Sequence, residues 1–308
     1  MFSSIWEDIK RQYSYGNMVT RLIIVNLIVV LIFGVLLRVI LTISAGEANP
    51  ASFTSVVKFF SLSSDIVFNI THPWVFITSM FLHIGFLHFL FNMLFLYFFG
   101  RIVSDLLGNQ RILPLYLLGG LAGGLAYLLT ANFVFGSPGY AFGASAAVMA
   151  IVMAAGVTAP DYRLHLILLG PVKLMYIVGV LLLIDIVGVA NMDNTGGRIA
   201  HLGGAFFGWL FVYQLRQGND WSGWVNRLLD RLSEFFNNLI TGRRKPKVVY
   251  RNPEAGAQRR TKRPKGRAAS DPESHQAKLD AILDKIKQSG YDSLTTEEKE
   301  FLFNASKK

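Results

Sequence analysis

The chain has no cysteine among its 308 residues. Disulfide bonds, thiolate nucleophiles and cysteine-bound metals are therefore excluded, and cysteine usage does not indicate the redox compartment. Charge is also scarce, because only 16% of the residues are charged whereas 52% are hydrophobic. The mean hydropathy is +0.40. Water-soluble domains rarely have this balance, so the sequence indicates a membrane protein.

Six apolar stretches are candidates for transmembrane helices, which need about 20 residues at about 1.5 Å per residue. We expect them near residues 22–43, 76–99, 112–133, 142–159, 166–190 and 199–213. The first stretch is longer than the apolar core of a signal peptide, so we interpret it as a transmembrane helix. The predicted fold class is an all-α membrane protein with a six-helix bundle.

Basic residues predict the orientation, because Lys and Arg in short loops stay on the cytoplasmic side. The loops and flanks assigned to that side contain Lys10, Arg11, Arg21, Arg101, Arg111, Arg163 and Arg216. The opposite loops are poorer in basic residues and contain Lys58 and Arg198. We therefore expect both termini in the cytoplasm and the beginning of the fourth stretch near the outer face.

The first loop, residues 46–74, is too long to be a simple connection and mixes aromatic with polar residues. This composition suits a segment that lies partly in the outer leaflet, with His72 and Trp74 as interface anchors. A plain extracellular loop is the alternative.

Three polar residues interrupt the second stretch: His83, His88 and Asn92. Such side chains are costly inside a bilayer, so they are expected to be functional or tightly paired. His88 and Asn92 are four residues apart and would share one helix face. His83 is five residues before His88 and would point away from that face.

Residues 142–147 read FGASAA and place Ser145 at the start of the fourth stretch, near the outer face. His201 lies near the outer end of the sixth stretch, where Gly204 and Gly208 allow close approach of another helix. Small residues of the fourth stretch offer the matching surface, which would bring Ser145 beside His201 as nucleophile and general base. A Ser-His dyad is the simpler hypothesis, and Asp185 in the fifth stretch is a candidate helper.

These motifs, in this order, resemble the rhomboid family of intramembrane serine proteases over about residues 74–213. The resembling residues are His83, His88 and Asn92, then Gly143 and Ser145, then Ala200, His201 and Gly204. The resemblance implies Ser145 as nucleophile, His201 as general base and acid, and His88 with Asn92 as oxyanion support. It implies a supporting role for His83 and Gly143, and no cofactor or metal.

The resemblance also implies a six-helix bundle around a water-filled cavity, and cleavage of single-span membrane proteins near the outer face. Two positions depart from the family pattern. Ala146 follows Ser145 where many members have Gly, and Trp74 is followed by Val75 where Arg is common. The alternative function is a catalytically silent rhomboid-like protein that binds membrane helices, and haem or metal ligation by the histidines is a further rival.

The tail after Arg216 changes in composition. We expect a membrane protease domain at 1–216, an amphipathic interfacial helix at 217–241, a basic disordered linker at 242–274 and a small helical hairpin at 275–308. Gly290 would end one hairpin helix, and Thr295 with Glu298 would form a capping box that starts the next. The linker is expected to contact anionic lipid and not nucleic acid. The hairpin would bind an unidentified cytoplasmic partner, and the setting predicted is a bacterial plasma membrane.

Overall fold

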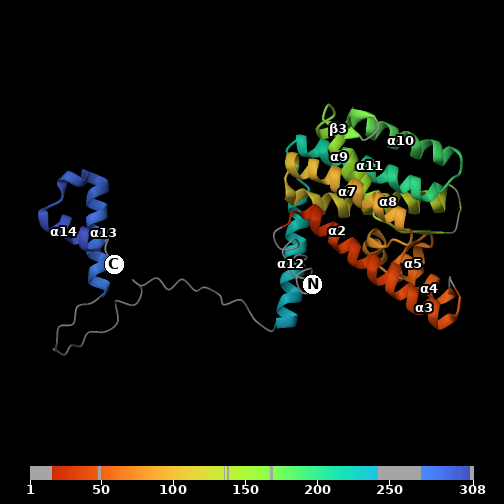
Figure 1. Cartoon of the computed structure of the whole chain (residues 1–308), viewed down its shortest axis with the longest axis horizontal. Coiled ribbons are helices and arrows are strands. Elements are labelled where there is room, and N and C mark those ends of the chain that lie inside the picture. The colour runs from red at the N-terminus through yellow and green to blue at the C-terminus, as the bar shows by residue number, and fades with distance from the viewer. Residues whose placement is uncertain are drawn as a thin grey trace. The chain divides into compact units, whose positions relative to one another are not determined.

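The computed structural model describes residues 16–47, 50–134, 136, 139–166, 169–241 and 272–305. Its contacts divide the chain into two units, Met1–Arg243 and Arg244–Lys308. The first unit consists of helices with two short two-stranded sheets (Figure 1). The prediction of a mainly helical chain is confirmed.

The bundle of the first unit is built from long helices that lie side by side (Figure 1). Its elements are α2 (Met18–Val29), the π-helix η1 (Val30–Leu37), α3 (Arg38–Ala45), α7 (Phe86–Leu107), α8 (Ile112–Phe133), α9 (Ser145–Thr158), α10 (Leu174–Ala190) and α11 (Thr195–Arg216). Ten of the 14 residues of α9 are buried, because α7, α8 and α11 surround this helix. The serine helix is therefore the centre of the bundle.

Each of the six predicted stretches contains a helix, but their lengths differ. In the described part of the chain, three helical segments are long and apolar enough to cross a membrane: Met18–Ala45, Phe86–Leu107 and Asn109–Phe133. Apolar helices of 10–17 residues are Ala51–Phe60, Ser145–Thr158 and Leu174–Ala190. The number of six membrane crossings stays a prediction.

Two predicted boundaries are wrong. The second stretch was expected at 76–99, but α7 begins at Phe86, after Gly85 in an extended conformation. Before it come the short helices α6 (Val75–Thr78) and η2 (Ser79–Phe81). The fifth stretch was expected from residue 166, but β3 (Arg163–Leu166) and β4 (Gly170–Lys173) form an antiparallel hairpin there. Apolar residues occur in hairpins as well as in helices, so hydrophobicity alone does not predict where these helices begin.

The first loop is folded. It contains α4 (Ala51–Phe60), β1 (Leu62–Ser63) and α5 (Ile66–Thr71), and β1 pairs antiparallel with β2 (Tyr140–Ala141) just before the serine helix. The indole N–H of Trp74 donates to the carbonyl oxygen of Phe59 at 3.0 Å, and the His72 ring stacks on Phe68. The β1–β2 pairing attaches the loop to the segment that leads into α9, and the contacts of Trp74 and His72 hold the loop itself together.

Helix α12 (Ser222–Thr241) follows the bundle, begins beside the ends of its helices and extends beyond them (Figure 1). Asp220 fixes its start, because its carboxylate accepts from the Ser222 N–H at 2.9 Å and pairs with Arg111 of η3 (Asn109–Arg111) at 2.7 Å. Large apolar residues on α12 remain exposed, including Trp224, Leu228 and Leu232. This exposure agrees with the amphipathic helix expected at 217–241.

The second unit contains α13 (Pro272–Ser289), η5 (Tyr291–Ser293) and α14 (Thr296–Ala305). Gly290, with φ of 78°, ends α13, and the predicted capping box is confirmed. The Thr295 N–H donates to Glu298 Oε2 at 2.8 Å, and the Glu298 N–H donates to Thr295 Oγ1 at 3.3 Å. The predicted basic linker at 242–274 lies almost wholly outside the described residues.

Small residues set the distances between α8, α9 and α11. A Cβ added to Gly204 or Gly208 of α11 would collide with the carbonyl oxygens of Ala146 and Ala150. On the other side of α9, a Cβ on Gly119 of α8 would collide with the Cβ of Ala150. The glycines of α8 are therefore packing contacts, as the small-residue pattern suggests.

This contact predicts a rescue experiment on stability. Gly119→Ala should lower the free energy of unfolding by about 1–3 kcal/mol, because the new methyl has no room. Ala150→Gly in the same chain should restore much of the loss, since it removes the methyl that is hit. The matched control is Gly179→Ala on α10, where no heavy atom lies within 4 Å of the new Cβ. Thermal unfolding of detergent-solubilised protein measures all three variants, and equal loss in Gly119→Ala and Gly179→Ala contradicts the contact.

Candidate active site

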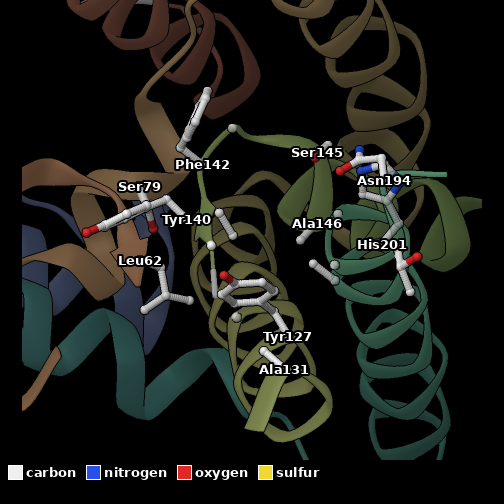
Figure 2. A pocket seen from close by; sticks show the side chains of 18 of the residues that line it. Leu62, Ser79, Tyr127, Ala131, Tyr140, Phe142, Ser145, Ala146, Asn194 and His201 are labelled. Carbon is white, nitrogen blue, oxygen red and sulfur yellow. The ribbon is translucent and has the colours of Figure 1, made fainter. Parts of the chain in front are cut away.

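One cavity of about 700 Å³ opens where α7, α8, α9 and α11 meet the segment 139–146. Ser145, His201, His88 and Gly143 line it, so four of the six predicted site residues share one space. In the view of Figure 2, Ser145, Asn194 and His201 lie on one side of this cavity. Leu62, Ser79, Tyr140 and Phe142 lie on the other side.

Ser145 is the first residue of α9 and is partly exposed to the cavity. The first N–H groups of a helix have no partner within the helix and carry partial positive charge. Ser145 therefore stands where a hydroxyl and free backbone amides face the same space. This arrangement suits a nucleophile next to a place for developing negative charge.

Gly143 allows the chain to turn into α9 against an imidazole ring. Its φ is 122°, a conformation that other residues rarely adopt, and its N–H donates to the carbonyl oxygen of Ser79 at 2.8 Å. An added Cβ would lie 2.7 Å from Cε1 of His88. Glycine at 143 is therefore required both by the turn and by the packing of His88.

His83 and Asn92 meet behind the cavity, and the prediction that they point apart is wrong. His83 lies before the start of α7, in non-helical chain, so helical spacing does not apply to it. His83 Nδ1 contacts the carbonyl oxygen of Phe81 at 3.2 Å. His83 Nε2 accepts from the Asn92 amide at 3.3 Å and from the Ala144 N–H at 3.4 Å. These two buried side chains therefore hold the backbone in front of Ser145.

Asn92 does not line the cavity in the structure. Its Nδ2 has two hydrogens, and they are directed at His83 Nε2 and at the carbonyl oxygen of His88, 3.0 Å away. His88, in contrast, is exposed to the cavity. The two residues predicted as oxyanion support thus have different positions.

His201 lies on α11, one turn before Gly204, whose backbone contacts Ala146. The side chains of His201 and Ser145 line the same cavity but form no hydrogen bond with each other among the described residues. Catalytic hydrogen bonds often tighten only when substrate is bound. His201 Nδ1 is engaged by Asp185 of α10, at 3.1 Å from Oδ1 and 3.2 Å from Oδ2.

The methyl group of Ala146, where the family often has Gly, has a defined place. The methyl group points toward Gly123 of α8. A Cβ added to Gly123 would lie 2.5 Å from the Cβ of Ala146. Ala146 is buried in a small cluster with Tyr127 and Ala200. The glycine of α8 therefore provides the space that this alanine needs.

From the sequence, Asp185 was only a candidate helper, and no residue of the loop between α10 and α11 was predicted to line the site. Met192, with φ of 57°, and Asn194, with φ of 44°, both line the cavity. Only the asparagine could have been suspected, because Asn adopts the left-handed conformation more readily than most residues. No metal-binding group of three His, Asp or Glu side chains is present in the described ranges.

Comparison with known proteins identifies the fold of this site. A model described as "Rhomboid domain" matches residues 71–218, and one described as "Family of unknown function (DUF6576)" matches residues 269–308. RHOMBOID-like protein 12, mitochondrial, from Arabidopsis thaliana is 32% identical over 46% of this chain and 46% of its own length. Presenilin-associated rhomboid-like protein A, mitochondrial, from Danio rerio is 31% identical over 44% of this chain and 36% of its own.

A third relative is named as an enzyme. Rhomboid protease GluP from Bacillus subtilis is 29% identical over 56% of this chain and 32% of its own length. The chain thus spans less than half the length of each of these three relatives. The rhomboid match includes Ser145, His201, His88 and Asn92. The segment at residues 71–218 is therefore a domain of the rhomboid family.

Proposed function

We propose that the chain is an intramembrane serine endopeptidase in which Ser145 is the nucleophile and His201 the general base. The observation that carries this proposal is that both side chains line one cavity from two helices in backbone contact. The similarity to a relative named rhomboid protease supports it. Ser145 is partly exposed to this cavity and so is accessible to a substrate.

The reaction follows from these positions. Ser145 Oγ attacks the scissile carbonyl carbon, and His201 Nε2 accepts the hydroxyl proton. When the tetrahedral intermediate collapses, the C–N bond breaks and His201 returns the proton to the leaving amine. Water, deprotonated by His201, then attacks the acyl ester. As the ester C–O bond breaks, His201 returns the proton to Ser145 Oγ, and the new carboxyl terminus is released.

Negative charge on the carbonyl oxygen needs donors close to Ser145. The free amides at the start of α9 and the exposed ring of His88 can supply them. Asn92 acts indirectly in this proposal, because its two amide hydrogens are donated to His83 and to the carbonyl oxygen of His88. Its contribution is to keep His83 against the Ala144 amide.

The substrate class proposed is a single-span membrane protein cut near the outer face. A helix hides its amides in its own hydrogen bonds, so the substrate must unwind locally before attack. Arg111 and Arg216 lie at the end of the bundle opposite Ser145, where Arg216 donates to the carbonyl oxygen of Val157 at 2.7 Å. Basic residues favour the cytoplasmic side, which supports an outer location for the site.

The cellular setting belongs to the same proposal. Lys10 and Arg11, used to orient the first helix, lie outside the described residues. Two relatives have "mitochondrial" in their names and the third comes from a bacterium. We propose a bacterial plasma membrane, with both termini in the cytoplasm and the C-terminal hairpin available to a protein partner there.

Removing either member of the dyad should abolish cleavage. Ser145→Ala and His201→Ala should each lower kcat at least about 10³-fold on a single-span membrane substrate in liposomes. Wild type should also react with a serine-directed fluorophosphonate, and Ser145→Ala should not. The matched control is Thr130→Val, which removes a hydroxyl that lines the same cavity but donates to the carbonyl oxygen of Ala126 at 2.7 Å.

The same assay separates the enzyme from a silent helix-binding protein. A silent protein would bind substrate helices equally with and without Ser145 and would leave them intact. Cleavage that persists in Ser145→Ala, or a wild type that neither cleaves nor reacts with the fluorophosphonate, would sink the proposal.

A double-mutant cycle tests how Asn92 acts. If Asn92 acts through His83, then His83→Ala and Asn92→Ala should each slow cleavage, and the double variant should be no slower than His83→Ala alone. If Asn92 instead donates directly to the intermediate, the two losses in ln kcat should add. The measurement is kcat for the four proteins at one pH.

A further inference from the structure

Asp185 is a carboxylate in the apolar helix α10, and only 5% of its surface is exposed. A buried charge without partners would cost several kcal/mol, so its contacts define its role. Two side chains of α11 reach it. His201 Nδ1 lies 3.1 Å from Oδ1, and Arg198 Nη1 lies 3.5 Å from the same oxygen.

Arg198 is held in place independently of His201. Its guanidinium donates to the carbonyl oxygen of Asp193 at 2.8 Å and to Asp193 Oδ2 at 2.5 Å. Gly188 of α10 makes room for it, because a Cβ there would collide with the guanidinium. Asp185 thus has a positive partner that does not titrate, so its negative charge does not require a protonated His201.

The contact with Asp185 determines which nitrogen of His201 can act as the base. An ionised carboxylate only accepts hydrogen bonds, so Nδ1 must carry the hydrogen that it donates to Asp185. In the neutral ring, Nε2 then has the free lone pair. Nε2 is the nitrogen that can accept the proton of Ser145.

We propose that Asp185 is a positioning residue for His201, so that Ser145, His201 and Asp185 work as a triad. The inference rests on the proposed function. Asp185 fixes the ring orientation and tautomer of His201 in the resting enzyme. When His201 accepts the Ser145 proton, the carboxylate also stabilises the imidazolium, while Arg198 limits this stabilisation.

Other ionisable groups near His201 are few. His88 of α7 lines the same cavity as His201. Tyr127 and Tyr140 also line the cavity. Asp185 is therefore the negative group that faces His201 among the described residues.

The test uses the full chain in liposomes and measures kcat, KM and the rate of fluorophosphonate labelling between pH 5 and 9. Asp185→Asn should lower kcat and labelling at least about tenfold with KM unchanged, because the favoured tautomer is lost. The pH at which activity is half-maximal on the acid side should move to lower pH, because the imidazolium has lost its anion.

Two variants control the test. Asp161→Asn removes an exposed carboxylate that pairs with Lys173 at 2.6 Å, away from Arg198 and His201, and should leave rate and pH profile unchanged. Arg198→Gln should move the acid-side midpoint to higher pH, because Asp185 then stabilises the imidazolium without competition. This variant keeps the test decisive even if Asp185→Asn fails to fold.

The outcomes separate this inference from the proposed function. An inactive, unlabelled wild type overturns both. If the wild type is active and Asp185→Asn is slower but keeps the wild-type acid-side midpoint, only the inference is overturned. That result indicates that Asp185 has a structural role alone. An unchanged midpoint in Arg198→Gln overturns it equally.

Discussion

The backbone contact between α9 and α11 is the constraint on which the site depends. Gly204 and Gly208 have no side chains, so the helix that contains His201 lies directly against the carbonyl oxygens of the helix that starts at Ser145. Residues 145 and 201 are far apart in the sequence, and only this approach brings them to one cavity. Any side chain at position 204 or 208 would therefore push α11, and His201 with it, away from Ser145.

Polar side chains in this bundle satisfy one another in two separate groups. His83 and Asn92 support the turn into α9, through the Ala144 amide. Asp185 of α10 contacts both His201 and Arg198 of α11. In each group, one polar side chain is held in place by its contact with another. Such pairing offsets the cost of placing polar groups in a low-dielectric interior. Ser145 and His201, the proposed nucleophile and base, are thus supported by different groups of residues.

The sequence was sufficient for some of these features and insufficient for others. Apolar runs predicted every bundle helix, and ordered motifs selected Ser145, His201 and His88, because residue type and spacing carry that information. The start of α7 was wrong because hydrophobicity continues through the non-helical residues before Gly85. That error also reversed the direction predicted for His83. The partnership of Asp185 depends on how α10 packs against α11, which no local pattern encodes.

The close contact of α8, α9 and α11 has a mechanical consequence. Helices joined by glycine-to-backbone contacts cannot slide past one another without collision, so they tilt as one body when a bilayer becomes thinner or thicker. Ser145 and His201 lie within that body, and their separation is insulated from lipid thickness. Asp185, on α10, lies outside it. A change in membrane thickness would therefore alter the distance between Asp185 and His201 before it alters the distance between His201 and Ser145.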